Sequence, residues 1–208
     1  MPLTACLVLS KSLRAPCPAV AAQPPSAEEA LRLAAAGRAA EAEQILLAME
    51  KANPGDPEIQ YRLGLVLLRN GKLAQARRRL ESAAKLAPEP LVWLALAQAR
   101  LRLDDLAGAL AAAGRARAGT SPHPELSQAL VLFDAEVIRY HLRKGQAQPA
   151  LDLTKSALAT SDLTVFHNLL GKAHELNKDP VTAAWELQQA VRLDPNQVTT
   201  TSTSLNCS

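Results

Sequence analysis

Small and apolar residues recur along this chain at fixed intervals, and polar residues fill most of the positions between them. Counted from Gly64, the pattern continues through Gly71, Ala76, Leu80, Ala83 and Pro88. The same spacing starts again at Ala30, Ala97, Ile138 and Gly171, so that successive origins are 34, 33, 41 and 33 residues apart. A period near 34 residues is that of a helix-turn-helix unit, and the pattern therefore predicts about five antiparallel helix pairs.

Each position of the spacing has a structural role. A small residue at the origin and on the second helix lets two antiparallel helices approach closely, since a bulky side chain there would push their axes apart. Gly37, Gly71 and Gly145 stand where the first helix ends, a place where a left-handed residue is common. No single unit can bury its apolar face alone, so the units are expected to stack.

Two units show the spacing most clearly, PEIQYRLGLVLLRNGKLAQARRRLESAAKLAP at 57–88 and TVFHNLLGKAHELNKDPVTAAWELQQAVRLDP at 164–195. They resemble the tetratricopeptide repeat (TPR) family, with about five repeats from Ser26 to Pro195. The resemblance implies an all-α fold, a right-handed superhelical solenoid of antiparallel helix pairs, with units near 23–55, 56–89, 90–123, 124–162 and 163–195. Residues 1–22 are then a leader or a degraded signal segment, and 196–208 a tail.

The third and fourth units depart from the family pattern. The third has Asp104 where glycine is usual, and neither unit has a proline at the expected step. The extra residues before Ile138 predict a longer first helix in the fourth unit and a bend of the superhelix there.

The resemblance also implies a concave groove, which the family builds from the outward face of each first helix and uses to hold a peptide or a partner's helix. The expected groove residues are Tyr61, Leu65, Leu68, Arg69, Gln98, Leu101, Arg102, Arg139, Leu142, Arg143, Asn168 and Lys172, with Glu175 and Leu176 beside the last two. Leucines flanked by arginines predict a protein partner whose segment carries apolar and acidic residues. The alternative is that these arginines form only a solvated rim.

One specialised activity of the family is not expected. Its chaperone-binding members hold a C-terminal carboxylate with Lys and Asn one turn apart on a first helix. Here Tyr61 and Leu65 stand at the corresponding positions, and only Asn168 and Lys172 resemble the pair, in reversed order.

Three histidines fall at matched positions near the origins: His141 and His174 three residues after, and His167 four before. The family usually has Trp, Tyr or another large side chain at these positions, so we expect the histidines to pack instead of forming a site. No Cys, Asp or Glu completes a ligand set at a recognisable spacing, and we expect no metal or other cofactor. His123, in the loop SPHP, is expected to be exposed.

Composition and charge narrow the function classes further. The 208 residues are 48% hydrophobic, and their formal net charge of +3 is too small to indicate a nucleic-acid or membrane-surface partner. The longest apolar runs, such as 91–97, are too short to span a membrane. GxSxG, phosphate-loop and HExxH motifs are absent, so we expect neither catalysis nor a small-molecule substrate.

Two alternative functions stay open. The first is a nucleic-acid-binding helical repeat, for which Arg77 to Arg79 supply charge without interleaved aromatic rings. The second is a metal-dependent enzyme that uses His141, His167 and His174.

The two ends of the chain carry weaker signals. The leader combines an apolar segment and a small-residue cleavage site with positive charges that follow the apolar run, so both a cytoplasmic location and export into a bacterial envelope stay open. Cys6, Cys17 and Cys207 lie in the leader and the tail, which leaves no cysteine between 23 and 196 to form a disulfide.

The Thr/Ser-rich tail has no helical period and is expected to be disordered. The last predicted helix, 181–193, should then expose an apolar flank that includes Val181, Trp185 and Val191. Such a flank predicts either self-association or docking of a partner, or a chain cut from a longer repeat array.

Overall fold

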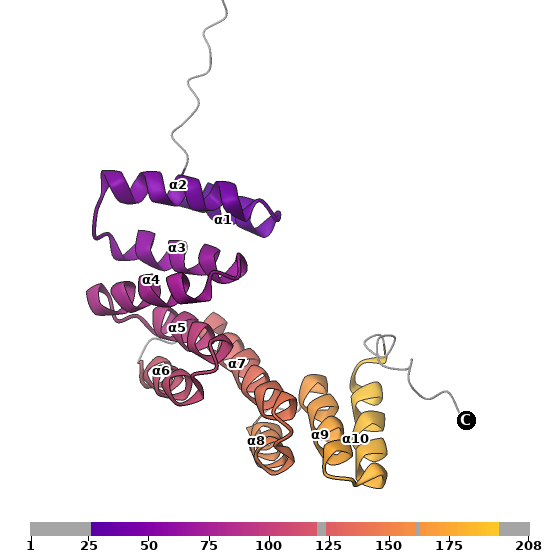
Figure 1. Ribbon diagram of the computed structural model, residues 1–208. Coiled ribbons are helices and arrows are strands. Elements are labelled where there is room, and N and C mark those ends of the chain that lie inside the picture. Colours follow the sequence, from indigo (N-terminus) through magenta and orange to yellow (C-terminus); the bar gives the residue numbers. More distant parts are fainter. Residues whose placement is uncertain (1–25, 120–123, 161–162, 196–208) are drawn as a thin grey trace, which may run out of the picture.

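Ten α-helices make up the regular structure of residues 26–119, 124–160 and 163–195, the part of the chain that the computed structural model describes. They are α1 (Ala27–Ala35), α2 (Ala39–Ala52), α3 (Pro57–Arg69), α4 (Leu73–Leu86), α5 (Pro90–Arg102), α6 (Leu106–Ala118), α7 (Pro124–Arg143), α8 (Ala147–Thr160), α9 (Thr164–Leu176) and α10 (Pro180–Leu193). These helices form five antiparallel pairs, and the pairs stack into a solenoid (Figure 1). The expected all-α repeat fold is therefore confirmed. The predictions for 1–22, His123 and 196–208 lie outside the described residues.

Short polar side chains set where several helices begin, because they accept hydrogen bonds from N–H groups that the first turn leaves free. The Asp56 carboxylate accepts from the Glu58 N–H at 2.9 Å ahead of α3. Pro57 follows at the first helical position, where no N–H is needed. Asp105 and Asp179 cap α6 and α10 in a similar way. None of the described helices is long and apolar enough to cross a bilayer.

A residue with a left-handed backbone lies in the turn of every helix pair. The φ angles of Gly37, Gly71 and Gly145 are 81°, 72° and 71°, in agreement with the spacing. Asp104 and Lys178 occupy the same turn in the third and fifth pairs, with φ of 69° and 61°. The turn therefore keeps one geometry in all five pairs, although only three of them have glycine there.

The two helices of a pair approach most closely where the origin residue has no side chain. A Cβ atom added to Gly64 would lie 2.6 Å from Cγ of Leu80, and one added to Gly171 would lie 2.9 Å from Cγ of Leu187. The leucine of the second helix thus fills the space beside the glycine, as the spacing of small residues predicted.

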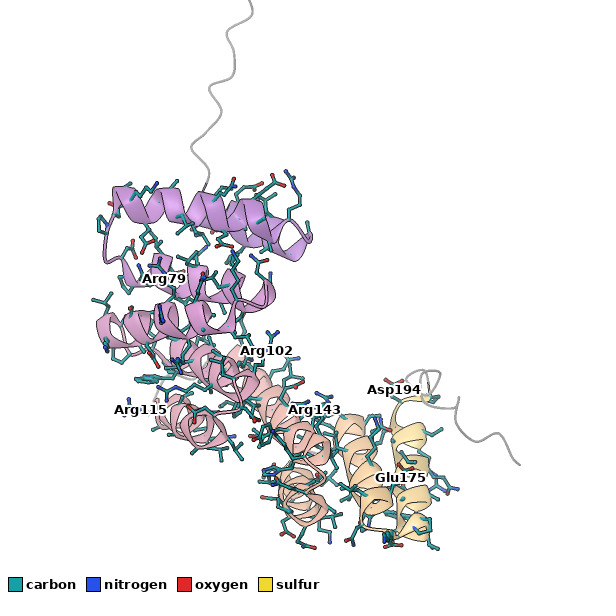
Figure 2. All side chains as sticks on the ribbon, viewed as in Figure 1. Arg79, Arg102, Arg115, Arg143, Glu175 and Asp194 are labelled. Atoms are coloured by element: carbon teal, nitrogen blue, oxygen red, sulfur yellow. The ribbon has the colours of Figure 1, made fainter. Side chains whose placement is uncertain are left out.

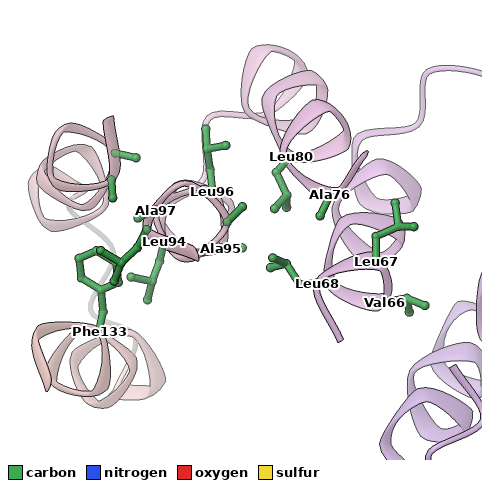
Figure 3. Packing of buried hydrophobic residues seen from close by; sticks show 14 of the residues in the cluster. Val66, Leu67, Leu68, Ala76, Leu80, Leu94, Ala95, Leu96, Ala97 and Phe133 are labelled. Atoms are coloured by element: carbon green, nitrogen blue, oxygen red, sulfur yellow. The ribbon is translucent and has the colours of Figure 1, made fainter. Parts of the chain in front are cut away.

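The longest helix is α7, with 20 residues against 13 in α3, α5 and α9. Phe133 and Val137 join the hydrophobic cluster of α1 to α6, and Figure 3 shows Phe133 pointing toward Leu94 of α5. Ala135 and Ile138 join a second cluster with α8 and α9. Contact between α6 and α7 is slight, whereas α4 packs well against α5 and α8 against α9. The extra length of α7 therefore connects two parts of the core.

The outer flank of α10 exposes large apolar side chains. The exposed fractions of Val181, Trp185 and Val191 are 80%, 55% and 40%. The apolar flank expected for the last helix is therefore present among the described residues.

Candidate partner-binding groove

A cavity of about 330 Å³ lies between the first helices of the second, third and fourth pairs. The residues that line it are Leu65, Leu68 and Arg69 of α3, Gln98, Leu101 and Arg102 of α5, and Glu136 and Arg143 of α7. All but Glu136 are among the expected groove residues. The positions four and five after an origin recur in this lining, because they project from the same face of each first helix.

The apolar part of the cavity is formed by three leucines. Leu68 and Leu101 are 6% and 5% exposed, and both belong to the hydrophobic cluster that extends through α1 to α6. Leu65 is half-buried beside them. This apolar surface is thus backed by a packed core.

Three guanidinium groups surround the leucines. Arg69, Arg102 and Arg143 each lie in the last turn of their helix, where the partial negative charge of the helix C-terminus favours a cation. Arg102 Nη1 donates a hydrogen bond to the Leu68 carbonyl at 2.8 Å, which links α5 to α3. Within the described residues, no carboxylate forms an ion pair with any of the three. Figure 2 shows Arg102 and Arg143 on the same side of the molecule.

The carboxylate of the cavity, Glu136, is already paired. It accepts a hydrogen bond from Arg139 at 2.6 Å on the same helix. Arg139 was expected to line the groove, but its guanidinium donates to this carboxylate and does not line the cavity. The charge left for a ligand therefore comes from the other three arginines.

Four other expected groove residues also lie outside the cavity lining. Tyr61 is partly buried against the core, and burial, followed by the nearby Glu58 carboxylate, raises the pKa of its hydroxyl. Leu142 packs against the second hydrophobic cluster. Asn168 and Lys172 belong to α9, beyond the helices that form the cavity.

A second hollow, of about 470 Å³, continues from the cavity and shares Leu101, Arg102 and Arg143 with it. Here Lys144 donates a hydrogen bond to the Asp104 carboxylate at 2.7 Å. This bond, together with one from the Tyr140 hydroxyl, holds the pKa of Asp104 below its usual value. Asp104 in turn raises the pKa of Lys144 and of Tyr140, so all three groups keep their ordinary charge at neutral pH.

The three histidines near the repeat origins are mostly buried, and each lies close to a polar side chain. His141 Nδ1 is 2.7 Å from Gln146 Oε1, and His167 Nδ1 is 2.7 Å from Glu186 Oε2. His174 Nδ1 lies 3.3 Å from an Asp179 oxygen. Each ring thus lies near a different polar side chain, although His174 Nδ1 forms no hydrogen bond within the described residues. In the described part of the chain, no group of three or more His, Cys, Asp or Glu is placed to hold a metal ion.

Comparisons with known proteins agree with this architecture. The family model for the tetratricopeptide repeat matches residues 33–99. The fold resembles MamA (residues 41 to the end) from Desulfovibrio magneticus RS-1, with 18% identity, a TM-score of 0.65, and coverage of 83% of this chain and 94% of that chain. It also resembles the C-terminal part of a TPR repeat-containing protein from Cytophaga hutchinsonii, with 16% identity, a TM-score of 0.67, and coverage of 82% and 66%.

A third solved structure is that of YrrB, a TPR protein with an unusual peptide-binding site, which is 15% identical with a TM-score of 0.57 and coverage of 81% and 84%. The comparison with curated proteins gives no match. At these identities the solved structures show the fold alone. The repeats matched at 33–99 and the solenoid of five helix pairs are together consistent with the tetratricopeptide repeat family.

Proposed function

We propose that this chain is a non-enzymatic scaffold that binds another protein, and that its groove holds a partner segment with apolar and acidic side chains. The observation that carries the proposal is the set of three arginines, Arg69, Arg102 and Arg143, around a cavity lined by leucines. Leucines can bury an apolar anchor, while each guanidinium can bind a carboxylate through two parallel hydrogen bonds.

The pairing of other arginines argues against a merely solvated rim. Most arginines outside the cavity have a carboxylate partner: Arg32 with Glu28, Arg38 with Glu41, Arg62 with Glu58, Arg77 and Arg100 with Glu81, Arg79 with Glu50, Arg117 with Asp134 and Arg139 with Glu136. The three groove arginines have none among the described residues. An acidic ligand would therefore meet guanidinium groups that form no ion pair within the described part of the protein.

The hydrogen bond from Arg102 to the Leu68 carbonyl supports the same site. It holds one guanidinium at the edge of the cavity before any ligand arrives. Since less side-chain freedom is then lost on binding, the arginine contributes more to affinity than a freely rotating one would.

The alternative functions have less support. Proteins that bind single-stranded nucleic acid stack bases on aromatic rings, and none lines the cavity. Tyr140, in the adjoining hollow, interacts with Lys144 over its ring and with Asp104 through its hydroxyl. The histidines that a metal enzyme would use each lie against a separate polar neighbour. A similar peptide-binding role for this chain and for YrrB is part of the proposal.

A charge-reversal experiment tests the groove. Arg69, Arg102 and Arg143 are changed together to Glu, and the control changes three exposed cations away from the cavity, Arg78→Glu, Lys155→Glu and Arg192→Glu. Both variants alter the net charge equally. We expect pull-downs with mass spectrometry to lose acidic partners only with the groove variant, while circular dichroism shows unchanged helicity in both.

A groove variant that keeps every partner of the wild-type chain would contradict the assignment. Equal losses in the two variants would assign the effect to net charge instead of the cavity. Binding of a random oligonucleotide by the wild type, abolished by salt, would favour the nucleic-acid alternative.

A further inference from the structure

A separate pocket of about 400 Å³ lies between α4, α5 and α6. Trp93 and Leu96 of α5 form its apolar wall, and Ala84, Ala111 and Ala112 leave the space open. None of these residues lines the groove. Figure 2 shows Arg115, which also lines this pocket, on the side of the molecule away from Arg102 and Arg143. We call this cavity between α4, α5 and α6 the Trp93 pocket.

The composition of α6 explains why the pocket is open. When the five repeats are aligned on their origins, the places of Ala111 and Ala112 hold longer side chains in every other unit. These are Gln44 and Ile45, Arg78 and Arg79, Asp152 and Leu153, and Trp185 and Glu186. Only the third unit has two methyl groups there, so the surface beside Trp93 is hollow instead of filled.

The charges of the pocket fall into two groups. Glu81 is 3.1 Å from Arg100 Nη2 and 3.8 Å from Arg77 Nε, and Arg100 also donates to the Gly108 carbonyl at 3.2 Å. Glu81 and Arg100 are thus paired with each other within the protein. Lys85 and Arg115 are exposed on the rim and form no ion pair with a carboxylate of the described residues. The rim thus carries two positive charges that form no ion pair in the part of the chain that the structure describes.

Arg115 is held in place by the aromatic ring. Its guanidinium carbon lies 4.5 Å from the centroid of a Trp93 ring, a cation–π geometry. A guanidinium that stacks on a ring keeps its N–H edge free, and this edge fits a carboxylate. Because Arg115 already covers the ring, Trp93 is not free to stack a nucleic-acid base, which favours an acidic peptide as the ligand.

We propose that the Trp93 pocket is a second binding site, for a partner segment that places a carboxylate next to a branched apolar side chain. The carboxylate pairs with Arg115 and Lys85. The apolar side chain enters the space above Ala111 and Ala112 and contacts Leu96 and the uncovered part of Trp93. The site is independent of the groove, so the chain presents two binding surfaces on different sides of the solenoid.

Tryptophan fluorescence tests this site directly. The chain has two tryptophans, Trp93 and Trp185, so Trp185→Phe leaves Trp93 as the single reporter. The probe is the peptide acetyl-Leu-Glu-Leu-amide, and its control is acetyl-Leu-Gln-Leu-amide. We expect a saturable change in Trp93 emission with the Glu peptide, and binding about tenfold weaker with the Gln peptide, since the charge-assisted hydrogen bonds are lost.

Two variants test whether the peptide binds in the Trp93 pocket. Ala111→Gln fills the hollow at an exposed position, and Arg115→Gln removes the guanidinium. Each variant should bind the Glu peptide about tenfold more weakly than the wild type. Arg192→Gln, on α10, should leave the affinity unchanged. The variant Arg69→Glu, Arg102→Glu, Arg143→Glu should also keep it, which distinguishes this site from the groove. Circular dichroism verifies that each variant is folded.

Several results would overturn the proposal. The first would be the absence of a saturable response to the Glu peptide. The others would be equal affinity for the two peptides and wild-type affinity in the Ala111→Gln variant. Loss of the response in the groove variant would move the binding to the groove. A response to a thymidine oligonucleotide but not to the peptide would show that the pocket serves nucleic acid instead.

Discussion

At the scale of single residues, the turn between the helices of a pair shows what sequence can and cannot reveal. Gly37, Gly71 and Gly145 could be placed in advance, because glycine adopts a left-handed backbone at little cost. Lys178 gave no such signal, yet its φ is 61°. The packing of α9 against α10 fixes the geometry of the turn, and the residue at position 178 adopts the left-handed backbone that this geometry requires.

This turn supports a prediction about stability. Lys178→Gly should raise the free energy of unfolding by about 1 kcal/mol, since glycine removes the steric cost of the left-handed backbone. Gly71→Ala should lower it by about 1 kcal/mol for the converse reason. Its added Cβ meets no atom within 4 Å, so no clash contributes. Urea unfolding measures both changes.

Lys178→Ala is the matched control for this pair. It removes the charged side chain but keeps the steric cost, so the free energy of unfolding should stay near that of wild type. If Lys178→Ala stabilises the protein as much as Lys178→Gly, the side chain and not the backbone is responsible.

At the scale of helices, the groove was largely predictable and the Trp93 pocket was not. The register of a repeat places equivalent positions on one face, so the resemblance to the repeat family assigned Leu68, Leu101 and Arg102, which line the cavity, to one groove. Glu136 was missed because it stands two residues before the origin of the fourth unit, a position that was assigned to the groove in no unit. The Trp93 pocket exists because α6 has alanines where the other second helices have longer side chains. A search of the sequence for functional groups does not detect such a hollow, because the alanines carry no functional group.

Helix pairs provide the second prediction. Gly64→Leu and Ala83→Leu should each lower the free energy of unfolding by about 1 to 3 kcal/mol, because overpacking pushes α3 and α4 apart. Even the Cβ of an alanine at position 64 would lie 2.6 Å from Leu80 Cγ. Gly114→Leu is the control, since a Cβ on this exposed glycine of α6 meets nothing within 4 Å. Thermal unfolding unchanged in both core variants would show that the repeat phase is wrong.

At the scale of the whole molecule, the two larger hydrophobic clusters of the solenoid meet at α7. Sequence predicted the long helix from the extra residues before Ile138, but not that its two faces would serve different clusters. That division depends on how far α7 turns relative to α5 and α8, and no single repeat contains this information. Both proposed binding surfaces include α5, which lies within the larger cluster.

The last prediction concerns association between copies of the chain through α10. Val181 and Trp185 lie one turn apart and are 80% and 55% exposed. Between Val181 and Val191 the one charged residue is Glu186, which is buried and contacts His167; the exposed Arg192 follows in the last turn of the helix. Two such flanks packed against each other would remove these apolar side chains from water.

We therefore expect a dimer whose fraction rises with concentration in size-exclusion chromatography with light scattering. Val181→Lys together with Trp185→Lys should make the chain monomeric, because two desolvated ammonium groups would then face each other. Lys155→Ala, an exposed change on α8, should leave the dimer fraction as in wild type. A wild-type chain that is monomeric at every concentration, with α10 fully protected from hydrogen exchange, would contradict both the association and the solvent exposure of this flank.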